Sequence, residues 1–478
     1  MTKENKKEKS FSSVETKSFI VVVCVLACVI LVAGLLSYFV PQGSFERDEA
    51  GQIIVGTYQK GEVDGIAPWR VITAPVRVFA SSDAVTIIMI CVFLLIMSGI
   101  FNLLDKTGGI KIFISRIIKK LRGKSNIVVC ATVLIFMLFG SFFGMFEELV
   151  TLLPIIIVFM LSMKLDTMTG LGVCLLGACF GFAAAITNPF SVGLASQVAG
   201  VTPATGIWLR IVFFVLIFGT LCAFLMLHLR KIAKNPALSP TYEADLTKRA
   251  QLSTDSGEEN PNADRIFRVY SAFFGIQLVT LLLIASVRAI SGYAIPILAV
   301  SFLVSGIVCG FLVAEEKKSV LKYIGNGIFS MLPAVFMIAM ASSVKLIMEE
   351  SGIIDTIMSS VISVLDGKSR LVAVLLIYAL ILFLQFFIGS ASAKIFLVMP
   401  IIMPIAAALG LSPSIVILAY CMADGFTDVI MPTNPILLIG LSFAGVSYSK
   451  WVKWTWKLQV TLLALTVAVL SFALAINY

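Results

Sequence analysis

The sequence predicts an all-α polytopic membrane protein made of two inverted repeats, each with a re-entrant hairpin and a broken helix. Hydrophobic residues make up 59% of its 478 residues and charged residues only 13%, whereas soluble domains carry about 25% charged residues. Apolar runs long enough to cross a bilayer recur along the whole chain. Landmarks of the first half return 246 residues later, as from Pro154 to Pro400. Together these observations predict about nine full spans and two hairpins.

The repeat is anchored on a polar stretch that interrupts apolar sequence. Residues 141–154 (SFFGMFEELVTLLP) correspond to residues 387–400 (FIGSASAKIFLVMP). The same shift carries residues 187–189 onto residues 433–435, and both triplets read Thr-Asn-Pro. Landmarks that keep one spacing in both halves indicate an internal repeat, a frequent design of secondary transporters.

The first half is predicted to cover residues 18–229, after a basic cytoplasmic tail at 1–17. Its hairpin, residues 126–163, has glycines and two carboxylates in mid-run, and such groups are tolerated at membrane depth where the backbone turns inside protein or lines a cavity. Proline breaks the segment after the hairpin, because it lacks an amide hydrogen and disfavours helix before it. The other predicted elements are a span at 18–40, an outer loop at 41–83, a span at 84–104, an amphipathic surface helix at 105–125, the broken segment at 169–205 and a span at 207–229.

A polar, charged linker without apolar periodicity separates the halves at residues 230–266 and is predicted to be cytoplasmic and flexible. The second half covers residues 267–478 and repeats the design. Its hairpin, residues 371–409, carries Lys394 as its only charge. The other predicted elements are spans at 267–289, 294–314 and 324–346, a connector at 347–370, the broken segment at 413–448 and a last span at 455–476.

The charges of the loops orient the chain. Loops that this layout places inside carry 26 of the 36 Lys and Arg residues, and loops placed outside carry 9. Because cationic residues accumulate on the cytoplasmic side, the N-terminus is predicted to be cytoplasmic and the C-terminus outside. The first hairpin then opens from inside and the second from outside, which makes the repeats inverted. A net charge of +9 that lies in short loops indicates membrane lipid and not nucleic acid as the partner.

Polar residues at the two hairpin tips and the two helix breaks are predicted to form the substrate site. Half-helix ends expose backbone amides and carbonyls that coordinate ions and charged groups of a substrate. Asp424 and Asp428 lie four residues apart, hence on one helix face, and their counterparts in the first half are uncharged. The candidate substrate-binding residues are Gly144, Glu147, Glu148, Thr187, Asn188, Ser390, Ser392, Lys394, Asp424, Asp428, Thr433 and Asn434.

Carboxylates outnumber cations in this set. Glu147, Glu148, Asp424 and Asp428 stand against Lys394 alone, which favours a cationic or zwitterionic substrate, or coupling to H⁺ or Na⁺. The alternative is an internal ion pair between Glu148 and Lys394 across the repeat axis, which leaves Glu147 or Asp428 as the better substrate contacts. The sequence indicates no resident metal or cofactor, and no nucleophile–base pair or nucleotide loop that would predict an enzyme.

Four passages around these residues resemble the YfcC-type transporters of the C4-dicarboxylate anaerobic carrier (DcuC-like) family, within the ion transporter superfamily. They read GMFEELVTLLPIIIV, GFAAAITNPFSVGLASQVAG, SASAKIFLVMPIIMPIAAALG and YCMADGFTDVIMPTNPILLIGL. The resemblance covers nearly all of the chain outside the tail and the linker. It implies a scaffold domain and a transport domain, in a homodimer that moves its substrate by an elevator-like shift. Related divalent anion–sodium symporters carry Ser-Asn-Thr at each hairpin tip, whereas residues 144–146 and 390–392 here read Gly-Met-Phe and Ser-Ala-Ser.

Two substrate classes stay open. The resemblance implies an antiporter of basic amino acids, of the arginine/ornithine type, in the bacterial inner membrane, and the acidic excess suits a guanidinium or ammonium group. The substrate carboxylate would then meet half-helix amides, Asn188 and Asn434, or Lys394. The alternative is a carrier of C4-dicarboxylates or other organic anions coupled to Na⁺ or H⁺, with Lys394, Ser390 and Ser392 as anion ligands. A channel or membrane enzyme is a third class, but inverted repeats with broken helices favour alternating access.

Overall fold

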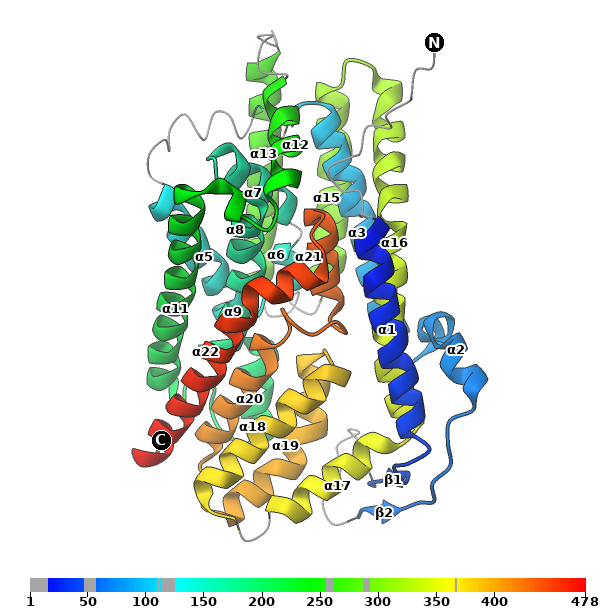
Figure 1. Cartoon of the computed structure of the whole chain (residues 1–478), viewed down its shortest axis with the longest axis vertical. Coiled ribbons are helices and arrows are strands. Elements are labelled where there is room, and N and C mark those ends of the chain that lie inside the picture. The colour runs from blue at the N-terminus through cyan, green and yellow to red at the C-terminus, as the bar shows by residue number, and fades with distance from the viewer. Residues whose placement is uncertain are drawn as a thin grey trace.

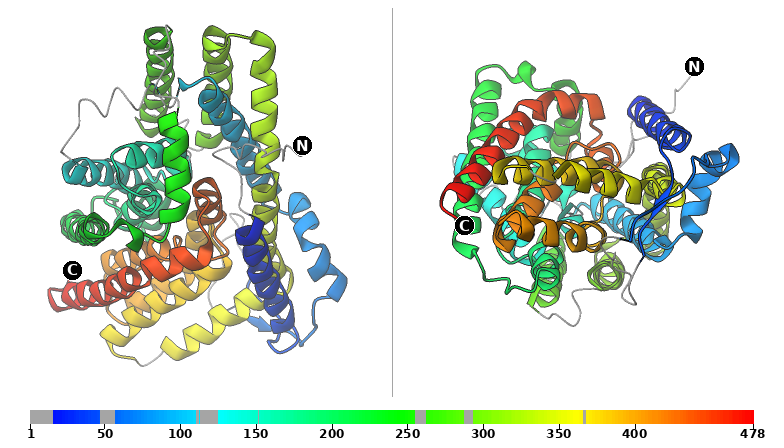
Figure 2. Two further views of the ribbon diagram at one scale, coloured as in Figure 1. Left: turned by 45° about the horizontal axis from the view of Figure 1, so that its top comes forward. Right: turned by 90° about the horizontal axis from the view of Figure 1, so that it is seen from below.

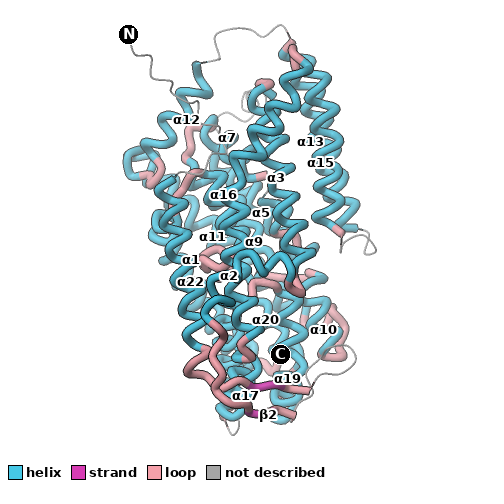
Figure 3. The backbone as a smooth tube through the Cα atoms, turned by 90° about the vertical axis from the view of Figure 1, so that its right-hand side faces the viewer, coloured by secondary structure: helices cyan, strands magenta, loops and turns pink. Residues whose placement is uncertain are grey.

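Helices make up most of the computed structural model, which confirms the predicted all-α class (Figure 3). In the described chain the strands are β1 (Gly43–Ser44) and β2 (Gln59–Lys60), a short antiparallel pair. Seven helices of the described residues are long and apolar enough to cross a membrane. The structure describes residues 16–46, 57–109, 112, 125–150, 152–254, 262–286, 293–365 and 368–478.

The elements of the first half follow the predicted order. The predicted spans at 18–40, 84–104 and 207–229 are helices, and the predicted breaks fall between helices. The predicted surface helix at 105–125 lies largely outside the described residues. The observed elements are α1 (Thr16–Leu36), α2 (Pro68–Arg77), η1 (Val78–Ala80), α3 (Ala84–Lys106), α5 (Ser125–Phe143), α6 (Glu147–Val150), α7 (Leu153–Ser162), α8 (Thr167–Leu171), the π-helical η2 (Gly172–Leu176), α9 (Gly177–Ala183), the π-helical η3 (Pro189–Gly193), α10 (Leu194–Val198) and α11 (Ile207–Lys234).

The second half also keeps its predicted order. The connector predicted at 347–370 is largely helical, because α17 places apolar residues along one side. The observed elements are α13 (Ala263–Ser286), α15 (Ala294–Val313), α16 (Lys317–Glu350), α17 (Ile353–Leu365), α18 (Arg370–Phe387), α19 (Ala391–Ala408), α20 (Pro413–Phe426), α21 (Pro435–Ala444) and α22 (Tyr448–Ala475).

The prediction of a flexible linker at residues 230–266 is wrong for its first part. Helix α11 runs on to Lys234, and η4 (Pro236–Leu238) and α12 (Tyr242–Thr254) follow. α12 packs against α7. The buried Asp245 carboxylate accepts hydrogen bonds from Thr167 and Thr241. These polar contacts, and not an apolar stripe, hold the segment, which is why hydrophobic periodicity did not reveal it.

The helices recur at the spacing of the sequence repeat. α21 spans Pro435–Ala444, and η3 with α10 spans Pro189–Val198, 246 residues earlier at both ends. α20 begins at Pro413, and α8 begins 246 residues earlier at Thr167. In Figure 1, α5 and α7 lie in the upper part of the molecule and α18 and α19 in the lower part, as expected when the two hairpins open from opposite sides.

Residues related by this spacing touch each other where α9 meets α20. The Cys179 thiol donates to the carbonyl of Gly425 at 2.8 Å, and those two positions are 246 residues apart. The rings of Phe180 and Phe426, also 246 residues apart, stack edge to face with centroids 5.3 Å apart. Contacts between equivalent positions are those that a two-fold axis between the repeats would produce.

Gly425 lets the two repeats approach closely, and its substitution by Ala is expected to destabilise the protein by more than about 2 kcal/mol through overpacking. A Cβ atom there would lie 2.5 Å from Ala183 Cβ and 2.7 Å from the Ala183 backbone nitrogen. Gly219→Ala is the matched control, because a Cβ atom at Gly219 meets nothing within 4 Å. Thermal unfolding in detergent should show a large loss for Gly425→Ala and little change for Gly219→Ala. Equal melting temperatures would show that α9 and α20 separate freely.

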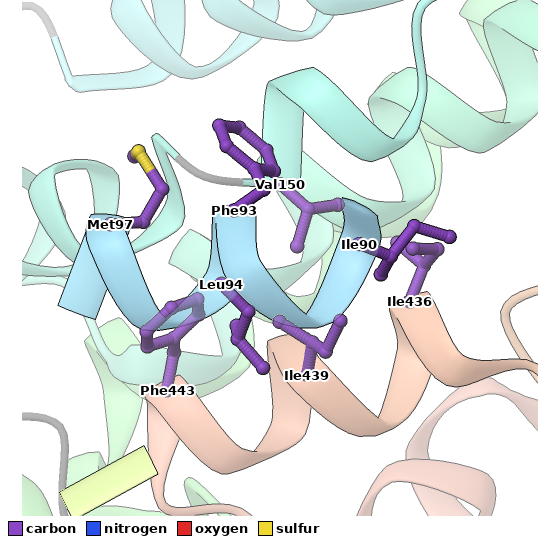
Figure 4. Close-up of a pocket in the computed structure, with 8 residues that line it drawn as sticks. All are labelled: Ile90, Phe93, Leu94, Met97, Val150, Ile436, Ile439 and Phe443. Carbon is purple, nitrogen blue, oxygen red and sulfur yellow. The ribbon is translucent and has the colours of Figure 1, made fainter. Parts of the chain in front are cut away.

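The helices form two groups. The first group is α1, α2, α3, α13, α15 and α16, and the second is α5–α12 with α18–α22; Figures 1 and 2 show them side by side. Where both partners are described, the hydrogen bonds and ion pairs join residues within one group, or join α17 to the loop around β1. A pocket at the seam is accordingly apolar (Figure 4). It is lined by Ile90, Phe93, Leu94 and Met97 of α3, Val150 of α6, and Ile436, Ile439 and Phe443 of α21.

Candidate functional site

The tip of the first hairpin lies against the first helix break. α5 ends before Gly144, whose φ of +70° is the left-handed conformation that glycine adopts without strain. A Cβ atom at Gly144 would lie 2.3 Å from Asn188 Oδ1, so only glycine fits this approach. The Ser141 carbonyl accepts the backbone N–H groups of Ile186, Thr187 and Asn188 at 3.0–3.2 Å. The first hairpin and the first break are therefore packed together, and the structure brings Gly144 and Asn188 into contact.

The oxygen and the nitrogen of the Asn188 side-chain amide differ in their contacts. Its Oδ1 accepts the backbone N–H of Phe190 at 2.9 Å and so caps η3, which begins at Pro189. Its Nδ2 has no hydrogen-bond partner among the described residues, and the side chain is fully buried. A buried donor without a partner costs free energy, and a ligand that accepts its hydrogen bond would remove that cost.

The second hairpin is also joined to the second break, here through a side-chain hydrogen bond. The Thr433 hydroxyl donates to the Phe386 carbonyl at 2.6 Å. Asn434 Oδ1 accepts the backbone N–H groups of Ile436 and Leu437 and caps α21. Unlike Asn188, Asn434 has a partner for its Nδ2, which donates to Asp428 Oδ1 at 2.8 Å. In both breaks an asparagine caps the helix that follows, but the partners of the two asparagine Nδ2 groups differ.

Lys394 and Asp424 form an ion pair inside the second repeat. Lys394 Nζ lies 2.5 Å from Asp424 Oδ1, and the two residues are 0% and 1% exposed. Beyond this contact neither charged group has a hydrogen-bond partner among the described residues. Sequence reasoning did not anticipate this pairing, since helix rotation decides which carboxylate the lysine meets. The pairing predicted between Lys394 and Glu148 stays a prediction, because the Glu148 side chain is outside the described part.

Asp428 is the second carboxylate of this site, and no described cation contacts it. Its Oδ1 accepts hydrogen bonds from Asn434 Nδ2 and Gln385 Nε2. Gln385, on α18, is 2% exposed, and its Oε1 has no partner among the described residues. Gln385 was missed from the sequence, although an amide within the apolar run of the second hairpin is a usable signal.

Buried polar atoms without partners gather at this site. Of fourteen buried polar atoms without a hydrogen bond among the described side chains, eight belong to the hairpins and breaks, whereas most buried polar groups of a folded protein are paired. η3 packs against α19 and α20, so the first break adjoins the elements that hold Lys394 and Asp424. The eight atoms are Asn188 Nδ2, Ser191 Oγ, Tyr378 Oη, Gln385 Oε1, Lys394 Nζ, both carboxylate oxygens of Asp424 and Thr427 Oγ1. Among these, Lys394 Nζ and Asp424 Oδ1 have only their contact with each other.

The remaining predicted site residues fall into two sets. Thr187 and Ser390 lie at the break and the tip where the sequence places them, and the Thr187 hydroxyl donates to the Phe142 carbonyl at 3.3 Å. Glu147 begins α6, close behind the first hairpin tip, and Ser392 lies in the first turn of α19. The side chains of Glu147, Glu148 and Ser392 lie outside the described part, so their roles stay predictions.

Comparison with known proteins places this architecture among membrane transporters. The family described as C4-dicarboxylate anaerobic carrier matches residues 18–475. A relative from Escherichia coli (strain K12), named "Putative basic amino acid antiporter YfcC", is 26% identical over 471 residues, 89% of this chain and 90% of that protein. An "Uncharacterized protein" of Haemophilus influenzae is 27% identical over 369 residues, 76% of this chain and 71% of that protein.

Two transporters of known structure are also similar to the chain. The Alcanivorax borkumensis YdaH transporter is 17% identical with a TM-score of 0.43, covering 96% of this chain and 98% of its own. Neisseria gonorrhoeae MtrF, from a class of antimetabolite efflux pumps, is 16% identical with a TM-score of 0.42, covering 95% of this chain and 94% of its own.

Proposed function

Because the chain belongs to the C4-dicarboxylate anaerobic carrier family, and is thus a multi-pass membrane transporter, we propose that it exchanges basic amino acids across the bacterial inner membrane. Its substrates would be amino acids of the arginine and ornithine type. The proposal is supported by the name of the Escherichia coli relative and, more directly, by the charges of the buried site.

Asp428 carries the substrate assignment. Two carboxylates, Asp424 and Asp428, share the buried site with one ammonium group, and Asp424 is already paired with it. An ionised carboxylate in such surroundings requires a cationic partner. A guanidinium or ammonium group beside Asp428 would supply the missing charge, and the free Gln385 Oε1 would accept one of its hydrogen bonds.

The opposite end of an amino acid needs hydrogen-bond donors, and the first break offers them. Asn188 Nδ2 and the Ser191 hydroxyl are buried and have no partner among the described residues. Asn434 is less suited to bind the substrate carboxylate than the sequence predicts, because its Nδ2 already donates a hydrogen bond to Asp428. Lys394 is likewise engaged with Asp424. The first break would thus bind the substrate carboxylate and the second its cationic side chain.

Alternating access would follow from the two groups of helices. The second group holds both hairpins, both breaks and the buried charges, and it meets the first group across an apolar seam (Figure 4). Sliding along such a seam breaks few directional bonds. We infer an elevator-like movement of the second group, with the first group as the fixed part of a homodimer and with the N-terminus in the cytoplasm.

Counterflow in proteoliposomes tests the substrate. Vesicles loaded with ornithine, lysine, aspartate or succinate would receive radiolabelled arginine or succinate outside, with and without a Na⁺ gradient. Accumulation of arginine driven by internal ornithine is the expected result. Accumulation of succinate, and not arginine, would overturn the proposal and make the chain an organic anion carrier.

A further inference from the structure

Asp166, in the loop between α7 and α8, joins several elements at one end of the second group. It caps α8 by accepting the backbone N–H and hydroxyl of Thr169 at 2.9 and 2.5 Å. Its other oxygen accepts from the Ser239 hydroxyl at 2.6 Å and lies 2.8 Å from His228 Nε2. Asp166 is 2% exposed and His228, on α11, is 7% exposed.

A third helix fixes the protonation state of His228. The indole Nε1–H of Trp454, on α22, donates to His228 Nδ1 at 3.1 Å. An indole N–H can only donate, so Nδ1 must carry a lone pair and the single ring proton must sit on Nε2. His228 is therefore neutral in this arrangement, and it donates to Asp166 while it accepts from Trp454. The imidazole thus bridges α11, the start of α8 and α22, and so links the two repeats.

The opposite end of the repeat pair has an equivalent bridge without an imidazole. Ser412 lies 246 residues after Asp166 and caps α20 by accepting the backbone N–H of Ile415 at 3.3 Å. Its hydroxyl donates to the carbonyl of Tyr478, whose own hydroxyl donates to the carbonyl of Gly206. The two bridges occupy corresponding places, but only the bridge at Asp166 contains an imidazole, which can accept a proton on a ring nitrogen.

We propose that His228 is a proton-binding switch, on the side predicted to face the cytoplasm, which releases α22 from the first repeat when it is protonated. A protonated imidazole has N–H groups on both nitrogens. The new Nδ1–H would point at the Trp454 N–H, and two donors repel each other. The imidazolium would keep its contact with Asp166, gaining an ion pair, while the contact with Trp454 is lost.

The charged groups around His228 leave this switch intact. Burial would raise the pKa of Asp166, but the hydrogen bonds from His228, Ser239 and Thr169, together with the charge of a protonated His228, lower it to about 2, so Asp166 stays ionised beside the imidazolium. On α12, Asp245 and Lys248 face Thr167 and not the imidazole. Arg230, Lys231 and Lys234 on α11, Lys164 after α7, and Lys450, Lys453 and Lys457 on α22 are exposed.

Release of α22 would separate this helix of the second repeat from the helices of the first repeat that it contacts. Trp454 packs on the backbone of η2, where a Cβ atom at Gly172 would lie 2.9 Å from the indole ring. On α12, Lys248 still joins Thr167 of the first repeat to the Ala444 carbonyl at the end of α21. Protonation of His228 would therefore remove the contact of α22 with the first repeat, while the contact of α21 through Lys248 remains. Acid would weaken the coupling between the repeats without unfolding them.

Hydrogen exchange measured by mass spectrometry tests the switch without any substrate, so its outcome is independent of the proposed exchange activity. After correction for intrinsic rates, wild-type amides of residues 448–458 are expected to exchange about fivefold faster at pH 5.5 than at pH 8, as for one lost hydrogen bond. Trp454→Phe should exchange at the faster rate at both pH values. His228→Gln, which stays neutral, should show no pH dependence in this segment.

Ser412→Ala is the matched control, since it removes the equivalent bridge at the opposite end. It should raise exchange around residues 412–418 equally at both pH values and leave the response of residues 448–458 as in the wild type. Unchanged protection of residues 448–458 between pH 8 and pH 5.5 in the wild type would overturn the proposal. A pH response that persists in His228→Gln would overturn it as well.

Discussion

Replacing Lys394 by Gln alone is expected to destabilise the protein by about 3–5 kcal/mol, because it leaves the buried carboxylate of Asp424 without its counter-charge. Asp424→Asn should cost a similar amount for the converse reason. The double variant Lys394→Gln/Asp424→Asn keeps the volume and removes both charges, so most of the lost stability should return. Thermal unfolding of the wild type and the three variants in detergent measures the change in stability that each substitution causes, and so completes a double-mutant cycle.

The ion pair also affects any use of Lys394→Gln to distinguish anionic from cationic substrates. Because Lys394 pairs with Asp424, the single substitution would combine lost stability with lost binding. The double variant separates the two effects: a cation exchanger should retain measurable arginine exchange, and an anion carrier should lose succinate transport. Single variants as stable as the wild type would show that the pair is not buried together.

Asp428→Asn is expected to lower arginine exchange about 100-fold, equivalent to about 2.7 kcal/mol of lost binding to a cationic group. The fold should survive, because the carbonyl oxygen of an asparagine can still accept from Gln385 and Asn434. Initial rates of counterflow in proteoliposomes, normalised to inserted protein, give the result.

Asp83→Asn is the control for this substitution. Asp83 pairs with Lys345 within the first group of helices, and its side chain is 41% exposed. Arginine exchange by this variant should stay within about twofold of the wild type, since exposed ion pairs contribute little free energy. Undiminished exchange by Asp428→Asn would contradict the carboxylate assignment and leave Glu147 and Glu148 to be tested in its place.

Much of the fold could be predicted from the sequence because the repeat fixes many boundaries at once. The Thr-Asn-Pro triplets place both breaks, because proline is favoured in the first turn of a helix and asparagine as the cap before it. Asn188 and Asn434 do cap the helices that begin at Pro189 and Pro435. Long apolar runs likewise mark the spans. Neither signal depends on how distant segments pack together.

The parts that the sequence did not predict depend on such packing. Which carboxylate meets Lys394 is decided by the rotation of α19 against α20, and nothing local distinguishes Asp424 from Glu148. Gln385 gains its importance only because α18 brings it to Asp428. The docking of α12 depends on Asp245 finding hydroxyl groups on another segment, and hydrophobic periodicity does not record such contacts.

The chemical difference between the two breaks has a consequence for the resting state of the carrier. If the inverted repeats had identical sequences, a two-fold rotation would relate the inward-open and outward-open forms, and their free energies would be equal. Here the carboxylates of α20 stand where α9 has Ala178 and Phe182, so the two forms cannot be equal. Without substrate, most carriers in a vesicle membrane should therefore hold the site open to the same side of the protein. The apparent affinity for a substrate should differ between its addition from the cytoplasmic side and from the outer side.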